Sequence, residues 1–307
     1  MTNVLENICL IVIAVEAIVG IWINGFIGLV KCIDWAKSRK LSLVDFILMS
    51  LAFSRMCLLW IMLVDGVMRV LYRDSYITSE NMKITGHLWV MTNNSSVSFV
   101  TCLNAYYFLK IAHFSHPVFL WLKWRINRVV FTTLLGSLII YLFLTLPIRE
   151  KFKDDLIGNM ERKEKNHTKP FQMKRFQFIV AHILLYLGPL ILLIITMISC
   201  FLLILSLWRH TWQMQLNATG SRDPSTEAHR RVIKWMVFLL FLVLLYHLGI
   251  SITILSSSML EEILGIAMAG LYPSSHSLIL ILENSKLRRA SLWVWKQALF
   301  CCRGGKA

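Results

Sequence analysis

Residues 8–30 read ICLIVIAVEAIVGIWINGFIGLV, in which Glu16 and Asn24 are the only acidic or amide side chains. A helix that crosses the hydrocarbon core of a bilayer needs about 20 mostly apolar residues, because the core is roughly 30 Å thick and each residue rises about 1.5 Å. The stretch meets this length. Since it lacks a basic leading segment and a small-residue cleavage site, we interpret it as a retained membrane-spanning helix and not as a signal peptide.

Six further apolar stretches follow this one along the chain. Together they predict helices near 8–30, 42–64, 84–109, 129–147, 177–207, 234–257 and 263–282. The chain is 57% hydrophobic and 16% charged, an apolar excess that one soluble core could not use. Because no internal repeat or interdomain linker is visible, we predict that residues 1–307 form a single all-α integral membrane domain, a seven-transmembrane helix bundle.

The connectors between these helices predict the orientation of the chain. Most lysine and arginine residues lie in 31–41, 110–128, 209–233 and the tail 283–307, whereas 1–7 and 258–262 have none. Because cytoplasmic loops are enriched in these residues, we expect the N-terminus outside and the C-terminus in the cytoplasm. The connector 148–175 has nine basic and five acidic residues, but the alternation of the other loops places it outside.

A glycosylation signal supports that placement of the connector 148–175. Asn166-His167-Thr168 is an acceptor sequence for N-glycosylation and lies in the middle of the connector. The similar signals at Asn93 and Asn94 lie inside a predicted span, and the one at Asn217 lies on a predicted cytoplasmic loop. We therefore expect Asn166 to carry the glycan.

Composition and motifs argue against several other classes of protein. The net charge of +15 comes from short clusters between apolar runs and not from one basic face, so we expect no nucleic-acid partner. The pair His113 and His116 has metal-ligand spacing, but Pro117 follows at once and no third ligand is evident. No phosphate-binding loop or nucleophile motif occurs, so we expect no metal, no cofactor and no enzymatic activity.

Polar side chains within the predicted spans mark surfaces that face the interior of the bundle, because exposing them to lipid is costly. Asn24, Arg55 and His276 are such residues, as are Glu16 and Asp45. For the guanidinium of Arg55, the candidate partners are Asn24, Ser54 and backbone carbonyl groups. Such a polar core either holds the helices together or repacks as a switch, and the sequence leaves both open.

The predicted third helix is rich in hydroxyl and amide side chains, so it is expected to lie among other helices and to border a cavity. Trp89, Asn93, Ser96 and Val100 follow a helical spacing and share one face. An aromatic surface beside an amide suits a small organic ligand. The alternative interpretation is helix packing through small polar residues.

Features near the predicted cytoplasmic side indicate helix ends and contact surfaces. Asp223, Pro224 and Glu227 form an N-cap pattern that starts the sixth helix inside the cytoplasm. Residues 284–299 form an amphipathic pattern ending at Cys301 and Cys302, which are candidates for lipidation. Pro189 and Pro273 allow bends in the fifth and seventh helices. A transporter or channel would also contain intramembrane polar residues, although such folds usually show repeats between their halves.

Several longer motifs occur in order along the chain: Asn24-Gly-Phe-Ile-Gly-Leu-Val30, Leu51-Ala-Phe-Ser-Arg55, Tyr107-Phe-Leu-Lys-Ile-Ala-His-Phe-Ser-His-Pro117, Ser206-Leu-Trp-Arg-His210 and Tyr272-Pro-Ser-Ser-His-Ser-Leu-Ile-Leu-Ile281. This set resembles the motifs of one family, the type 2 (bitter) taste receptors, a group of G protein-coupled receptors. The third helix ends Phe108-Leu109-Lys110 without Asp-Arg-Tyr, which departs from the rhodopsin-like class as this family does.

The resemblance implies a plasma-membrane receptor that binds small bitter organic ligands in an outer transmembrane cavity. Position by position, the ligand-binding candidates are Trp89, Asn93, Tyr246 and Ile266, with Asp65, His182 and Glu262 as further candidates. It also implies a heterotrimeric G protein partner of the gustducin or inhibitory type. The candidate contacts for that partner are Lys110, His210, Gln213 and Met214. Membrane lipids could occupy the same cytoplasmic surface, and a receptor oligomer is a further candidate assembly.

Overall fold

The structure is a computed structural model, and it describes residues 2–72, 80–112, 114, 116–140, 190–209, 211–212, 224–256 and 258–302. These residues form helices connected by short segments, and no strand occurs among them. The described part of the chain is therefore all-α, which confirms the predicted fold class.

Helices lie at all seven positions expected from the apolar stretches. They are α1 (Thr2–Ser38), α2 (Leu43–Leu71), α4 (Glu80–Ile111), α6 (Ile126–Ile140), Leu190–Arg209, α9 (Pro224–Leu255) and α10 (Met259–Glu283). Two others, α5 (Pro117–Trp124) and α11 (Ser285–Cys302), follow α4 and α10. Within the described ranges, five helices are long and apolar enough to cross a membrane; α4 is more polar and α6 shorter. The orientation of the bundle remains a prediction.

Most of these helices extend beyond the predicted spans. α1 has 37 residues, about 55 Å of helix, whereas the hydrocarbon core is roughly 30 Å thick. α9 begins at Pro224, as the pattern of Asp223, Pro224 and Glu227 predicts. Residues 256–258 separate α9 from α10, and α10 starts with a capping box. The Ser258 hydroxyl accepts from the backbone N–H of Glu261, and the Glu261 carboxylate accepts from the backbone N–H of Ser258.

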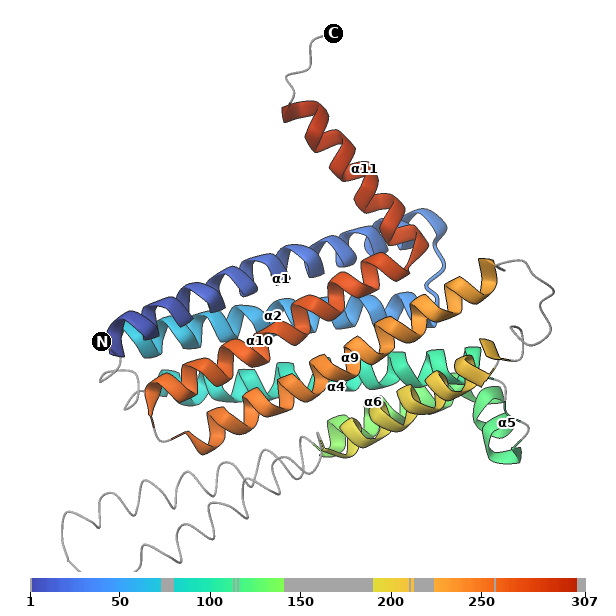
Figure 1. Cartoon of the computed structure of the whole chain (residues 1–307), viewed down its shortest axis with the longest axis horizontal. Coiled ribbons are helices and arrows are strands. Elements are labelled where there is room, and N and C mark those ends of the chain that lie inside the picture. The colour runs from blue at the N-terminus through green and yellow to red at the C-terminus, as the bar shows by residue number, and fades with distance from the viewer. Residues whose placement is uncertain are drawn as a thin grey trace, which may run out of the picture. The chain divides into compact units, whose positions relative to one another are not determined.

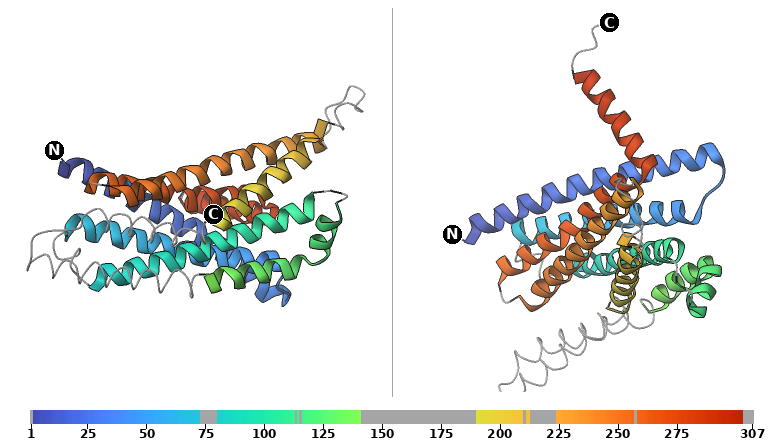
Figure 2. Two further views of the ribbon diagram at one scale, coloured as in Figure 1. Left: turned by 90° about the horizontal axis from the view of Figure 1, so that it is seen from below. Right: turned by 45° about the vertical axis from the view of Figure 1, so that its right-hand side comes forward.

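The chain divides into two compact units, residues 1–93 with 202–307, and residues 94–201. In the first unit α1 packs against α2 and α10, and these three helices run side by side in Figure 1. α9 packs along the other side of α10 (Figure 2). Glycines permit this approach: a Cβ atom on Gly249 would lie 2.7 Å from the carbonyl oxygen of Gly265. Small residues at such crossings are typical of membrane helices.

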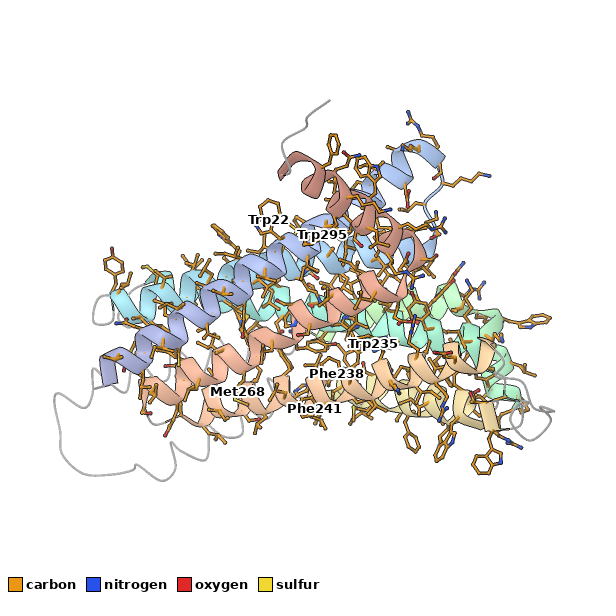
Figure 3. The ribbon with its side chains drawn as sticks, turned by 45° about the horizontal axis from the view of Figure 1, so that its top comes forward. Trp22, Trp235, Phe238, Phe241, Met268 and Trp295 are labelled. Atoms are coloured by element: carbon orange, nitrogen blue, oxygen red, sulfur yellow. The ribbon has the colours of Figure 1, made fainter. Side chains whose placement is uncertain are left out.

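The outer faces of the first unit expose large apolar side chains. Trp22 on α1 is 77% exposed, and Phe238 and Phe241 on α9 are also exposed (Figure 3). Water-soluble monomers rarely expose apolar surface on this scale, whereas lipid chains would cover it at no cost. These faces agree with the membrane-spanning interpretation.

In the second unit, two polar side chains of α4 contact residues on other helices. The hydroxyl groups of Thr101 and Thr196 lie 2.9 Å apart, and the Cys102 thiol donates to the carbonyl oxygen of Val130 at 3.7 Å. Phe108 on α4 forms a cluster of three aromatic rings with Phe114 and Phe119. The Nδ1 atom of His116 accepts from the backbone N–H of Val118 at the start of α5, which gives this histidine a capping role.

Candidate functional site

Asn93 and Tyr246, both predicted to bind ligand, meet in a buried hydrogen bond. Tyr246 Oη on α9 donates to Asn93 Oδ1 on α4 at 2.6 Å, and both side chains are less than a tenth exposed. A buried polar pair of this kind is satisfied only while both partners stay in place. The bond therefore couples the side chains of two helices.

The other two candidates from the resemblance lie on α4 and α10. Trp89 is half-buried and stands one turn before Asn93, as their shared helical face requires. Ile266 on α10 is buried and apolar. Together with Asn93 and Tyr246, these residues provide an indole, an amide, a phenol and an aliphatic side chain.

The two acidic candidates, Asp65 and Glu262, form ion pairs with one arginine. Arg69 Nε lies 2.7 Å from Asp65 on the same helix, and Arg69 Nη1 lies 2.5 Å from Glu262 on α10. We call these three residues the outer ion cluster. Sequence reasoning missed Arg69, although its spacing of four residues from Asp65 is that of an intrahelical ion pair.

Arg55 forms the centre of a second polar group, the inner polar core, with Ser277, Asn24 and Tyr272. Arg55 Nη1 donates to Ser277 Oγ at 2.8 Å, and Ser277 Oγ donates to Asn24 Oδ1 at 2.7 Å. The carbon Cζ of Arg55 lies 5.5 Å from the centre of the Tyr272 ring, a cation–π distance. One hydroxyl thus links α1, α2 and α10.

This geometry corrects the partners suggested for Arg55. Ser54 does not bind the guanidinium, because its hydroxyl donates to the Leu51 carbonyl within α2 at 2.9 Å. Asn24 is reached only through Ser277. Hydroxyl groups on helices often bond to their own preceding turn, which explains why a neighbour in sequence was a poor guide. The nitrogens Nε and Nη2 of Arg55 have no hydrogen-bond partner among the described residues.

Aromatic rings connect the two ligand candidates on α4 and α9 with the inner polar core. The ring centres of Tyr246 and Tyr272 lie 5.6 Å apart, and the Tyr272 ring stacks on His276 at 5.6 Å. His276 is almost fully buried, as expected for a residue facing the interior. A continuous chain of contacts therefore runs from Asn93 through Tyr246 and Tyr272 to Arg55.

The remaining predicted site residues are far less constrained by the structure. Lys110 is exposed in the last turn of α4, and its Nζ donates to Tyr106 Oη at 3.1 Å. Five predicted site residues lie outside the described residues: His182, His210, Gln213, Met214 and Asn166. Pro189, where a bend was predicted, also lies outside them. Asp45, which was predicted to face the interior, forms an ion pair with Lys31: its carboxylate lies 2.7 Å from Lys31 Nζ.

Comparison with known proteins supplies the family. The profile of the taste receptor protein (TAS2R) family matches residues 1–298. Taste receptor type 2 member 7 of Papio hamadryas is 46% identical over 311 residues, covering 100% of this chain and 98% of the relative. Taste receptor type 2 member 9 of Macaca mulatta is 44% identical over 296 residues, covering 95% and 94%. The family consists of multi-pass membrane receptors and not of enzymes. This chain belongs to the type 2 (bitter) taste receptor family of G protein-coupled receptors.

Proposed function

We propose that the chain binds a small bitter organic molecule in an outer transmembrane cavity beside Trp89, Asn93, Tyr246 and Ile266, and activates a heterotrimeric G protein. The observation that carries this proposal is the buried bond between Tyr246 and Asn93. A ligand that offers its own donor and acceptor can replace this bond and leave Tyr246 and Asn93 with hydrogen-bond partners. A ligand that only breaks the bond leaves both side chains unpaired, which costs binding free energy.

The side chains of the candidate site favour compact, largely apolar ligands with a few polar groups. The indole of Trp89 and the aliphatic Ile266 provide apolar contact, while the Asn93 amide offers a donor and an acceptor. Asp65, Glu262 and His182 are further candidate contacts. Because Asp65 and Glu262 both pair with Arg69, a cationic ligand would have to compete with that arginine for them.

The chain of contacts toward Arg55 gives a physical route from ligand to the inner polar core. A ligand that displaces Tyr246 changes the surroundings of Tyr272, which contacts Arg55 and His276. Two nitrogens of Arg55 have no hydrogen-bond partner among the described residues, and Pro273 within α10 permits a bend, so a second arrangement of these residues is sterically and chemically accessible. If the ligand binds that arrangement better, it increases its population. The alternative is that Asn24, Arg55 and His276 only hold the helices together.

On the cytoplasmic side we propose a G protein of the gustducin or inhibitory type, with Lys110, His210, Gln213 and Met214 as contacts. This proposal follows from the family and from the exposure of Lys110. Anionic lipids compete for the same basic surface. The receptor would act in the plasma membrane, alone or as an oligomer.

The orientation that this function requires can be tested at Asn166. Glycosidase treatment of the expressed receptor should shift its gel mobility, and Asn166→Gln should abolish the shift, because only an outer loop meets the glycosyltransferase. An unchanged band in both cases would place the loop 148–175 inside.

The ligand site is tested by truncating two side chains on α4. Trp89→Ala and Asn93→Ala should each cost about 2 kcal/mol of agonist binding, or about thirtyfold in potency, with near-normal surface expression. The readout is the calcium or G protein response to several unrelated bitter agonists. The control is Leu138→Ala, since Leu138 on α6 is 52% exposed. Wild-type potency of both variants at the surface would exclude this site.

A further inference from the structure

The last helix, α11, carries a concentrated positive charge and one serine in a distinctive position. Lys286, Arg288, Arg289 and Lys296 are its charged residues, and it has no acidic residue. Ser291 follows two arginines at the second and third positions before it and precedes Leu292. A kinase with carboxylates for two arginines and an apolar pocket for the next residue would recognise this pattern through charge-assisted hydrogen bonds.

Among the described residues, the start of α11 packs against the rest of the first unit. Leu287 is fully buried in a cluster with Ile27, Ala52 and Ile281, and the Asn284 carboxamide accepts from the backbone N–H of Leu287. Beyond that turn the helix extends away from α10 (Figure 1). Its apolar side chains there are exposed, including Trp293, Trp295 and Phe300. A basic helix with exposed tryptophans is suited to lie at a membrane surface.

Among the described residues, the hydroxyl of Ser291 has a hydrogen-bond partner in its own helix. It donates to the Arg288 carbonyl at 2.9 Å, one turn earlier. Ser291 lies beyond the turn of α11 that packs at Leu287, and a helical segment with few packing contacts opens locally at a low free-energy cost. Ser291 therefore combines a recognisable sequence with a half-buried side chain whose hydroxyl is bonded within α11.

A second serine with a similar sequence is harder to extract from its helix. Ser42 follows Arg39 and Lys40 and precedes Leu43. However, Ser42 caps α2: its hydroxyl accepts from the Asp45 backbone N–H and donates to the Asp45 carboxylate at 2.5 Å. Extracting it would break the start of a transmembrane helix, and a phosphate there would face a carboxylate. The structure thus distinguishes Ser291 from Ser42 as kinase substrates, although the residues before and after them are similar.

We propose that Ser291 is the phosphoacceptor for a basophilic serine kinase, and that the phosphate releases α11 from an anionic membrane surface. The inference rests on the proposed cytoplasmic placement of α11. In the reaction, Ser291 Oγ attacks the γ-phosphorus of ATP as the bond to the β-phosphate oxygen breaks. ADP leaves, and a carboxylate of the kinase takes the hydroxyl proton.

The release follows from charge and position. The phosphate adds about two negative charges to a helix with four positive ones, and basic residues each contribute about 1 kcal/mol to binding anionic lipid. The two negative charges of the phosphate therefore weaken the binding of α11 to anionic lipid about thirtyfold. Ser291 also lies one turn after Leu287, on the same face of α11, so the phosphate is introduced beside an apolar contact.

The test uses the full receptor in nanodiscs containing phosphatidylserine, where both membrane faces are accessible. The catalytic subunit of cyclic-AMP-dependent protein kinase and Mg-ATP are added, and phosphates are counted and mapped by mass spectrometry. We expect one phosphate on Ser291, absent in Ser291→Ala and retained in the matched control Ser42→Ala. Arg289→Gln should slow incorporation about tenfold. Phosphate on Ser42, phosphate persisting in Ser291→Ala, or no incorporation would overturn the assignment.

Hydrogen exchange of the α11 amides then tests the release. Phosphorylation should speed exchange in phosphatidylserine nanodiscs, by up to about thirtyfold, and leave it nearly unchanged in neutral ones. Equal exchange before and after phosphorylation in anionic nanodiscs would overturn the release. Neither measurement needs an agonist or a G protein, so their failure is distinct from failure of the proposed receptor function.

Discussion

Two arginines on α2 reach α10 in different ways. Arg69, near the end of α2, is 17% exposed and pairs with Asp65 and Glu262. Arg55, near the middle of the helix, is fully buried and binds the hydroxyl of Ser277 and the ring of Tyr272 instead. The same side chain is thus neutralised by carboxylates at the helix end and surrounded by neutral groups in the interior.

The difference shows how position along a membrane helix determines what an arginine can do. Near the ends, helix dipoles favour the cation on the last turn of α2 and the acid on the first turn of α10, and water screens the pair. In the interior, neutral partners leave the charge incompletely stabilised. The outer ion cluster is therefore suited to a static contact, whereas the inner polar core is suited to a change of arrangement.

Removing Arg55 should have the largest effect. Arg55→Ala leaves a cavity and deprives Ser277 and Tyr272 of a partner, so we expect a stability loss of about 2–5 kcal/mol. Surface expression or the maximal response should fall for all agonists alike. Thermal unfolding of the purified receptor and the response to several agonists measure this.

The control for that variant is Ser54→Ala, on the same helix. The Ser54 hydroxyl bonds within α2, so stability should change by less than about 0.5 kcal/mol. Loss of response to one agonist alone in Arg55→Ala would instead place Arg55 in the ligand site.

Breaking the outer ion cluster should have a smaller, salt-dependent effect. A double-mutant cycle of Arg69→Gln and Glu262→Gln should give a coupling free energy of about 1 kcal/mol in thermal unfolding, because both groups are partly exposed. The coupling should decrease at high salt. A coupling that is independent of salt would mean that the pair is buried more deeply than its exposure of 17% and 27% indicates.

The helices were predictable from the sequence because a bilayer demands long apolar runs. The residues 8–30 and 263–282 gave the positions of α1 and α10, although the helices extend further at both ends because helix length is not limited to the membrane thickness. The capping pattern predicted the start of α9 at Pro224. Local rules of spacing and capping were sufficient for these features.

Partners across helices were harder to predict. Arg55, Asn24 and His276 were identified as interior residues, because polarity within a span implies it. Which hydroxyl would bind Arg55 depends on the packing of α2 against α10, and sequence gives no register between helices. Ser277 was therefore missed and Ser54 suggested wrongly. The bond between Asn93 and Tyr246 joins residues 153 positions apart, and only the assembled helices reveal it.

The most direct test of the account is a double-mutant cycle of Asn93→Ala and Tyr246→Phe, read as agonist potency in cells with surface expression measured in parallel. Tyr246→Phe should weaken potency about fivefold, because one hydrogen bond contributes about 1 kcal/mol. If ligands act where these side chains meet, the double variant should be no weaker than Asn93→Ala alone. If the potency losses of the two single variants multiply in the double variant, or if all three variants keep wild-type potency, a ligand site at the bond between Asn93 and Tyr246 is contradicted.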